Sequence, residues 1–222
     1  FNDNDLLAPP SLYSFGNAEI LNAPLTIALS GTTSPSSDGF RAAQAIAQIA
    51  AQRGWVVVGG HAFGVDQATQ MGALDEEKPS LAVMVNGLTG PKDRPYPPMK
   101  YIDRGIIEYG GAMVSEFLDP ATNEKERQDR ILQRDRVMSA LADVVLVIES
   151  DDIKSGTADT ARRGYLQGKR VFAIDWTKVK SGYKFAEASN ILSEHLFQEG
   201  IAERFPIATN EVFFTDFPKI IA

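Results

Sequence analysis

The sequence contains no cysteine among its 222 residues. It therefore has no disulfide, no thiolate metal site and no cysteine nucleophile, and it suits a reducing compartment. Histidine is almost as scarce, since only His61 and His195 occur. A histidine-rich metal site is excluded on that ground. These absences predict a cytoplasmic protein with no metal site and no cofactor.

Long apolar runs are also missing. No uninterrupted run exceeds five residues, as in 144–148, whereas a membrane-spanning helix needs about 20. No signal-peptide pattern opens the sequence. The P-loop, the Gly-x-Gly-x-x-Gly dinucleotide signature and the Gly-x-Ser-x-Gly elbow are absent as well. We expect no membrane partner and none of the activities that depend on these three motifs.

The formal net charge is −7. An acidic balance argues against nucleic-acid binding, for which a basic footprint is expected. The charge is uneven, however, because residues 124–170 hold ten Lys/Arg against nine Asp/Glu, while the remainder holds twelve against twenty. This pattern leaves two interpretations open, a local basic face on an acidic body or ordinary solvated helices of mixed charge.

Short apolar runs alternate with segments of helical periodicity, and most runs end in glycine or a small polar residue. This alternation predicts an α/β fold, with a Rossmann-like parallel sheet of about six or more strands and helices on both faces. The expected strands are residues 25–30, 55–58, 81–85, 112–116, 144–149 and 171–174. The expected helices are residues 39–53, 64–74, 99–109, 124–141 and 157–168.

Around this alternating region the chain is less regular. Residues 1–24 are interpreted as an N-terminal arm packed on the core, with Leu12, Tyr13 and Phe15 as packing points. Residues 25–176 form the predicted core, and residues 177–222 a C-terminal extension of the same domain. Within that extension, 212–214 is a candidate edge strand.

Three glycine-marked turns follow predicted strands and begin at Gly31, Gly60 and Ser155. Ligands bind at the carboxyl ends of strands in an open parallel sheet, and helix N-termini offer free N–H groups to anions. The turns therefore predict one phosphate-accepting crevice with Arg134 or Arg136 at its edge. The candidate ligand-binding residues are Gly31, Thr32, Thr33, Gly60, His61, Gly64, Asp66, Arg134, Arg136, Ser155, Gly156 and Thr157.

Several of these candidates have a plain structural alternative. His61 either touches a ligand or stabilises its turn. Asp66, Glu116 and Glu149 lie at or just after strand ends, where paired carboxylates could perform acid–base chemistry or hold a ribose. The alternative is that Asp66 caps a helix and Glu116 is a buried, hydrogen-bonded residue, and we favour it.

The order of these motifs resembles the DprA/Smf family of DNA-processing proteins over residues 12–174. That family carries a Gly-Ser-Arg turn, a Gly-x-Ala-Arg-Gly-Ile-Asp turn, a Tyr-Pro-Pro stretch, a Ser-Glu strand end, an Arg-Asn-Arg helix and a Ser-Gly-x-x-x-Thr-Ala turn. Here the matching segments are residues 31–33, 60–66, 96–98, 115–116, 134–136 and 155–161.

The resemblance implies a protein that binds single-stranded DNA and acts in DNA processing and recombination. It also implies a recombinase partner and a homodimer. Two turn arginines of the family are Thr33 and Phe63 here, so two bidentate phosphate contacts are missing. Thr33 can still donate a hydroxyl hydrogen bond, and Phe63 either stacks on a base or packs internally.

A related superfamily offers an alternative function. Nucleotide phosphoribohydrolases resembling lysine decarboxylases share this fold and use an Arg-x-x-x-Met helix, which residues 134–138 match. Their catalytic glutamate falls on Thr160, which cannot ionise and so cannot act as a carboxylate base. We therefore expect no catalytic residues, and the alternative to a DNA-binding protein is a sensor, or a cleaving protein, for a phosphate-bearing nucleotide.

Overall fold

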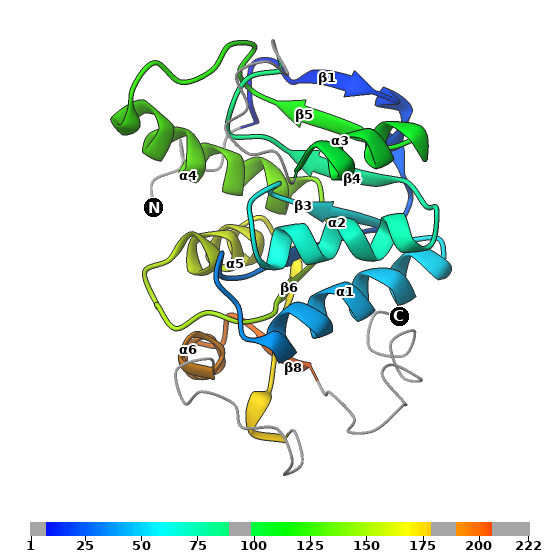
Figure 1. The fold of residues 1–222 in the computed structure, drawn as a ribbon. Coiled ribbons are helices and arrows are strands. Elements are labelled where there is room, and N and C mark those ends of the chain that lie inside the picture. The colour runs from blue at the N-terminus through cyan, green and yellow to red at the C-terminus, as the bar shows by residue number, and fades with distance from the viewer. Residues whose placement is uncertain (1–7, 89–98, 179–189, 206–222) are drawn as a thin grey trace.

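The apolar runs pair into one sheet in the computed structural model, which describes residues 8–88, 99–178 and 190–205. Eight strands lie in the order β1-β5-β4-β3-β2-β6-β7-β8 (Figure 1). All neighbouring pairs are parallel except β1 with β5. The strands are β1 (Tyr13–Gly16), β2 (Thr26–Ser30), β3 (Val56–Gly59), β4 (Ser80–Val83), β5 (Ala112–Ser115), β6 (Val144–Val147), β7 (Arg170–Ile174) and β8 (Glu203–Phe205).

Helices cover both faces of this sheet (Figure 1). The helices α1 (Ser37–Gln52), α2 (Val65–Asp75) and α3 (Met99–Glu108) lie on one face. The helices α4 (Glu124–Ala140), α5 (Gly156–Leu166) and α6 (Ile191–Gln198) lie on the other. This architecture confirms the predicted Rossmann-like α/β fold.

The two hydrophobic layers follow from the alternation of side chains along each strand. In the central strand β2, Ile27 and Leu29 belong to the cluster formed with α1 and α2, whereas Ala28 belongs to the cluster formed with α4, α5 and α6. All five residues of β2 are buried. Burial on both faces explains why the central strands read as continuous apolar runs.

Three helices begin at polar caps that the sequence supplies just before them. The side chains of Ser36, Asn123 and Ser155 accept hydrogen bonds from backbone N–H groups in the first turns of α1, α4 and α5. Such caps satisfy N–H groups that have no partner within the helix. They fix where these helices start relative to the strands.

Both edges of the sheet hold elements that the sequence did not predict. β1 comes from the N-terminal arm, and its Tyr13 and Phe15 are 40% and 57% exposed rather than packed inside, whereas Leu12 just before it packs against the core as predicted. At the other edge, β8 follows α6 and pairs with β7, and Phe205 packs edge-to-face against Phe172. The candidate strand 212–214 lies outside the described residues, and the boundaries 1–24, 25–176 and 177–222 stay a prediction.

No helix in the described part of the chain is both long enough and apolar enough to cross a membrane.

Candidate functional site

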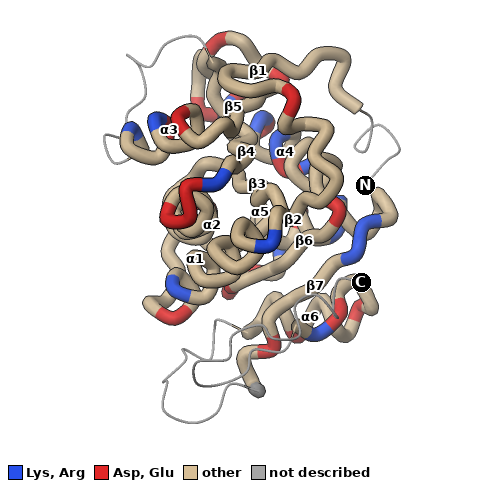
Figure 2. Tube along the Cα trace, turned by 90° about the vertical axis from the view of Figure 1, so that its right-hand side faces the viewer, with Lys and Arg blue, Asp and Glu red and all other residues tan. Residues whose placement is uncertain are grey.

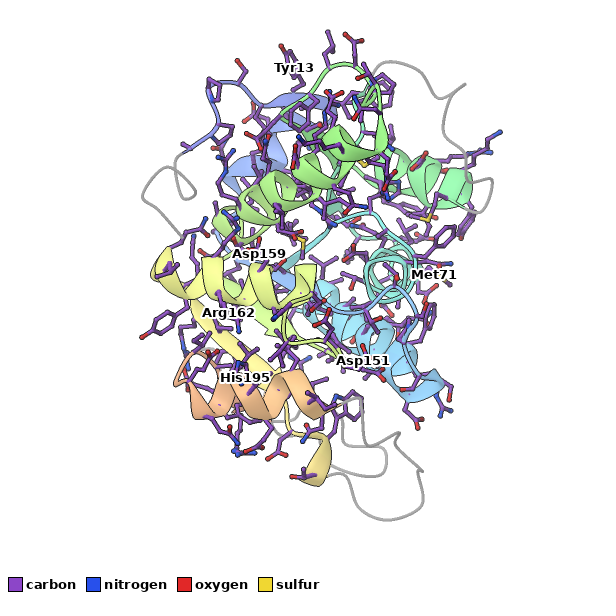
Figure 3. The ribbon with its side chains drawn as sticks, turned by 90° about the vertical axis from the view of Figure 1, so that its left-hand side faces the viewer. Tyr13, Met71, Asp151, Asp159, Arg162 and His195 are labelled. Carbon is purple, nitrogen blue, oxygen red and sulfur yellow. The ribbon has the colours of Figure 1, made fainter. Side chains whose placement is uncertain are left out.

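A cavity lies at the carboxyl ends of β2, β3, β4 and β6. It has a volume of about 620 Å³ and is lined by residues 30–33, 60–63, 84–86, 150–152 and 155–157, together with Asp66 of α2, one face of α4 and the start of α3. β2 and β6 are neighbours, yet the chain leaves β2 toward α1 on one face and leaves β6 toward α5 on the other. A crevice opens where adjacent connections diverge in this way, and such switch points bind ligands in open α/β sheets. In Figure 3, Asp151 of this lining lies between α5 and α1.

Two of the glycine-marked turns interlock beside the cavity. Gly64 has a φ of 76°, and a Cβ there would lie 2.5 Å from the Thr32 carbonyl oxygen. A Cβ on Gly31 would lie 2.5 Å from a methyl carbon of Val65. The Val65 N–H donates to the Thr32 carbonyl oxygen across the same contact, at 3.2 Å. Glycine at both positions therefore allows the turn after β2 and the start of α2 to pack together.

One face of α4 forms a wall of the cavity. The residues that line it are Arg127, Ile131, Arg134 and Asp135, a spacing that places them on a single helical face. Figure 2 shows basic and acidic positions interleaved along this helix. The wall is therefore a mixed surface rather than a basic one.

Arg134 lies across the floor of the cavity between two carboxylates. Its Nη1 is 3.3 Å from Oδ2 of Asp66, and its Nε is 3.1 Å from Oδ1 of Asp135. The guanidinium occupies the space beside Gly60, where a Cβ would be 1.1 Å from Nη1. Gly60 thus makes room for the arginine rather than for a ligand phosphate.

Asp135 is the most deeply buried charged group of the lining, with 3% of its side chain exposed. Burial raises the pKa of this carboxyl to about 7 against the lowering effect of Arg134. Asp66 and Asp159 raise the pKa further, and Arg163 lowers it. Its Oδ2 has no hydrogen-bond partner among the described residues. The charge at this position therefore changes near neutral pH.

His61 lies in the turn after β3 with a φ of 57°. Its Nε2 is 2.6 Å from Oδ1 of Asp103 in α3, and 4% of its side chain is exposed. Its Nδ1 has no hydrogen-bond partner in the described part of the chain. The pairing fixes the imidazole against α3 and places its ring in the cavity lining.

The third turn combines a cap with small residues. The Ser155 hydroxyl accepts from Ala158 N–H at the start of α5 and is also hydrogen-bonded to Ser150 and to the Asp152 carbonyl oxygen. Gly156 and Thr157 follow in the lining. The turn therefore presents a helix N-terminus to the cavity.

The structure brings ten of the twelve predicted site residues into this one lining, all except Gly64 and Arg136. Gly64 supports the lining through its contact with the turn at Thr32. Arg136 corrects one part of the prediction, because it faces away from the cavity and forms an ion pair with Glu116. Side chains two residues apart on an α-helix point in directions that differ by about 200°, so Arg134 and Arg136 cannot face the same cavity.

The other predicted carboxylates also lie away from the cavity lining. Burial raises the pKa of Glu116 even though it pairs with Arg136. Glu149 accepts hydrogen bonds from the backbone and hydroxyl of Ser36, and burial raises its pKa. Glu116 is held by Arg136, as the favoured alternative predicts. The same alternative was wrong for Asp66, which does not cap α2: Gly64 is the N-cap, and Asp66 Oδ2 instead accepts from Ala62 N–H and pairs with Arg134. In the described residues, no group of three or more His, Asp or Glu could hold a metal ion.

The sequence did not single out several residues of the lining. Helical periodicity starting from Arg134 could have identified three of them, because they share its helical face: Arg127, Ile131 and Asp135. Asp151 and Asp152 follow β6, but no motif marks them. Met84, Val85 and Asn86 follow β4, which carries no glycine signal.

Comparison with known proteins points to one family. The profile of the family described as DNA recombination-mediator protein A matches residues 5–205. The Smf protein of Escherichia coli K12 is 31% identical over 169 residues, which are 75% of this chain and 42% of that protein. The chain thus spans about two fifths of the length of this relative.

Two solved structures share the fold. The chain superposes on DNA processing protein A of Helicobacter pylori with a TM-score of 0.71 and 27% identity, covering 88% of this chain and 82% of that one. The H. pylori structure is described as revealing a unique single-stranded DNA binding mode. DNA processing protein A of Streptococcus pneumoniae gives a TM-score of 0.72 and 26% identity, covering 91% of this chain and 65% of that one.

Proposed function

The chain belongs to the DNA recombination-mediator protein A family, and from this premise we propose that it binds single-stranded DNA in DNA processing and recombination. The binding site is the cavity at the carboxyl ends of β2, β3, β4 and β6. The observation that carries the proposal is the convergence of the turns at Gly31, Gly60 and Ser155 on this cavity, in a fold shared with a protein described as binding single-stranded DNA.

The chemistry of the cavity suits a flexible strand better than a rigid duplex. Its lining offers backbone and hydroxyl groups at Thr32, Thr33 and Thr157, the N-terminus of α5, and the aromatic ring of Phe63. Hydroxyl and N–H donors contact phosphates and sugars, and aromatic side chains stack on unpaired bases. A volume of about 620 Å³ admits a nucleotide unit of a strand that passes over it.

The phosphoribohydrolase alternative gains no support from the site. Thr160, at the position of the catalytic glutamate, is buried and donates its hydroxyl hydrogen bond to the Gly156 carbonyl oxygen. It does not line the cavity. The proposal is therefore a binding protein rather than a hydrolase.

The test is a titration of labelled oligo-dT at low salt, with AMP and dTMP as competitors. Thr33 is exposed and lines the cavity, so Thr33→Glu places a negative charge where phosphates would pass. We expect about tenfold weaker binding, since one repulsion near a protein surface is worth about 1 kcal/mol or more. Gln52→Glu is the matched control, because Gln52 is exposed at the far end of α1.

Binding of oligo-dT by the parent, weakened by Thr33→Glu and unchanged by Gln52→Glu, supports the proposal. Absence of oligo-dT binding contradicts it. Binding of a mononucleotide that oligo-dT does not displace would instead favour a nucleotide sensor.

Family membership extends the proposal to partners. We infer a homodimer and a recombinase partner, and we place the protein in the cytoplasm, as the sequence predicts. Sedimentation analysis across a range of concentrations tests the dimer, and co-sedimentation with a purified bacterial recombinase on single-stranded DNA tests the partner. A monomer at every concentration would contradict the first inference, and recombinase loading unaffected by this chain would contradict the second.

A further inference from the structure

Among the described residues, Arg134 is the only arginine on the cavity floor, and two neighbouring carboxylates neutralise its charge. Arg134 contacts Asp66 at 3.3 Å and Asp135 at 3.1 Å, and 11% of its side chain is exposed. The space beside Gly60 holds its guanidinium in this position. A side chain paired on two sides and enclosed in this way has no freedom to reach out to a phosphate.

The charges of the described lining sum to an excess of acid. The lining contains four acidic residues, Asp66, Asp135, Asp151 and Asp152, but only two basic ones, Arg127 and Arg134. Arg127 in turn donates two hydrogen bonds to Glu124. A phosphate brought to the floor would meet more negative than positive charge, and in a partly enclosed site such repulsion is poorly screened.

A large part of the remaining lining suits an uncharged, flat group. Apolar side chains form much of the wall, namely Ala62, Phe63, Met84, Val85, Met99 and Ile131. An unpaired base brings a π-face to such walls and N–H donors to carboxylate oxygens. A phosphate brings only acceptors at neutral pH, so it cannot satisfy the Asp135 carboxylate.

We propose that Asp135 is a specificity-determining residue: by neutralising Arg134 it makes the cavity floor accept an unpaired base and keeps the backbone phosphates at the rim. This inference rests on the single-stranded DNA binding proposed above. The rim offers Thr33 and the nearby Lys154, which are both exposed. The Arg-Asn-Arg motif quoted above carries an uncharged amide where this chain has Asp135, so an asparagine is compatible with the fold at this position.

The charge of Asp135 can be changed by pH as well as by mutation. The charged groups that face it are Arg134 on its own helix, Asp66 on α2, and Asp159 and Arg163 on α5. Burial among them raises its pKa to about 7. Protonation leaves Arg134 with one carboxylate instead of two, so the floor gains one positive charge and becomes more acceptable to phosphate.

The experiment compares oligo-dT with an abasic oligomer of the same length, by fluorescence anisotropy at pH 6 and pH 8 over a series of salt concentrations. The proteins are the parent, Asp135→Asn and Asp75→Asn. Asp75 is exposed at the far end of α2, so its substitution changes the net charge equally without touching the cavity.

For the parent at pH 8 we expect the abasic oligomer to bind about tenfold more weakly than oligo-dT, because one stacked base contributes on the order of 1–3 kcal/mol. Asp135→Asn should bind the abasic oligomer more tightly than the parent does. Its slope of log K against log salt should be steeper by about 0.7, the value of one added phosphate contact on a single strand. The parent at pH 6 should likewise bind the abasic oligomer more tightly, and with a steeper salt slope, than it does at pH 8. Asp75→Asn should behave as the parent at both pH values.

Asp135→Asn should also lose most of the pH response, and a response that survives in it belongs to groups other than Asp135. The inference fails if Asp135→Asn matches the parent in abasic affinity and salt slope, or if Asp75→Asn changes as much. It fails too if the parent binds both oligomers equally well at pH 8. If no protein binds either oligomer, the proposed function fails and the inference with it. Circular dichroism reports whether Asp135→Asn is folded, and the pH 6 measurement on the parent decides the question if it is not.

Discussion

Asp135 is in a position where an ionised carboxylate is costly. It lies on α4 with 3% of its side chain exposed, beside Arg134 and close to Asp66 and Asp159. Desolvation disfavours the charged form, and one arginine shared between two carboxylates compensates only in part. The residue therefore lowers stability when it is charged, which is typical of groups kept for binding rather than for folding.

This cost gives a pH-dependent stability. The folded-state pKa of about 7 lies above the ordinary value of 3.8, so the folded state binds the proton more tightly. The free energy of unfolding of the parent therefore falls as the pH rises from the ordinary pKa of 3.8 to the folded-state pKa of about 7. Asp135→Asn removes the charge, so its gain in unfolding free energy over the parent should be larger at pH 8 than at pH 5, by about 3 kcal/mol.

Urea denaturation of both proteins at the two pH values measures this difference. Asp75→Asn serves again as control, because its exposed carboxyl at the end of α2 is far from the cavity. An equal gain at pH 5 and pH 8 would show that Asp135 does not titrate in this range.

The interlocked turns are what hold the cavity in shape. The turn after β2 and the start of α2 meet through Gly31, Gly64 and the hydrogen bond from Val65 N–H to the Thr32 carbonyl. The helices α1 and α2, which follow these turns, also pack directly on each other through small residues. A Cβ on Gly72 of α2 would lie 2.3 Å from the Gln44 carbonyl oxygen of α1. Close approach of the two helices thus fixes the two turns relative to each other.

Gly64→Ala should therefore destabilise the protein more than a positive φ alone would. The new Cβ would lie 2.5 to 2.7 Å from the backbone of Thr32 and Thr33 and from Pro35, so one turn has to move. Gly54→Ala is the matched control, since Gly54 has a φ of 82° and nothing within 4 Å of its Cβ position. We expect Gly54→Ala to cost about 1 kcal/mol and Gly64→Ala about 3 kcal/mol or more.

Thermal and urea unfolding of the two variants give the comparison. Equal losses for Gly54→Ala and Gly64→Ala would mean that the turns do not depend on each other.

The sequence predicted the central strands because they are buried on both faces and therefore form continuous apolar runs. The runs at 25–30, 144–149 and 171–174 became β2, β6 and β7 with ends shifted by two residues at most. β1 and β8 were not predicted because most of their side chains are exposed, so that neither strand forms an apolar run. Their assignment depends on pairing with β5 and β7, which no local pattern reveals.

The glycine turns that line the candidate site could be predicted from the sequence, but the pairing of its arginines could not. Strand-end turns with glycine identified Gly31, Gly60 and Ser155, because a ligand crevice has to lie where parallel strands end. The sequence could not show that Arg134 is paired, since its partner Asp66 comes from another helix, 68 positions away in the chain. Nor could it show that Arg136 faces Glu116, because the rotation of α4 about its own axis is set by tertiary packing.

A net charge of −7 opposes the approach of DNA over the whole molecule. The two turn positions that carry arginine in the family, Thr33 and Phe63, carry no charge here. Binding should therefore depend weakly on salt, because few phosphates are neutralised and few counterions are released. It should also depend more on bases than on the backbone.

Restoring one arginine tests this balance. Thr33→Arg adds a guanidinium at an exposed position of the cavity lining, where a bidentate phosphate contact becomes available. We expect the slope of log K against log salt for oligo-dT to steepen by about 0.7 and the affinity at low salt to rise about tenfold or more.

Gln52→Arg is the matched control, because it makes the same change of net charge at the far end of α1. If general attraction were enough, both variants would gain alike at low salt, where screening is weak. Steepening confined to Thr33→Arg would instead locate the phosphate path at the turn after β2. A slope unchanged in Thr33→Arg would mean that the strand does not pass this turn, and the DNA-binding surface would then have to be sought elsewhere on the molecule.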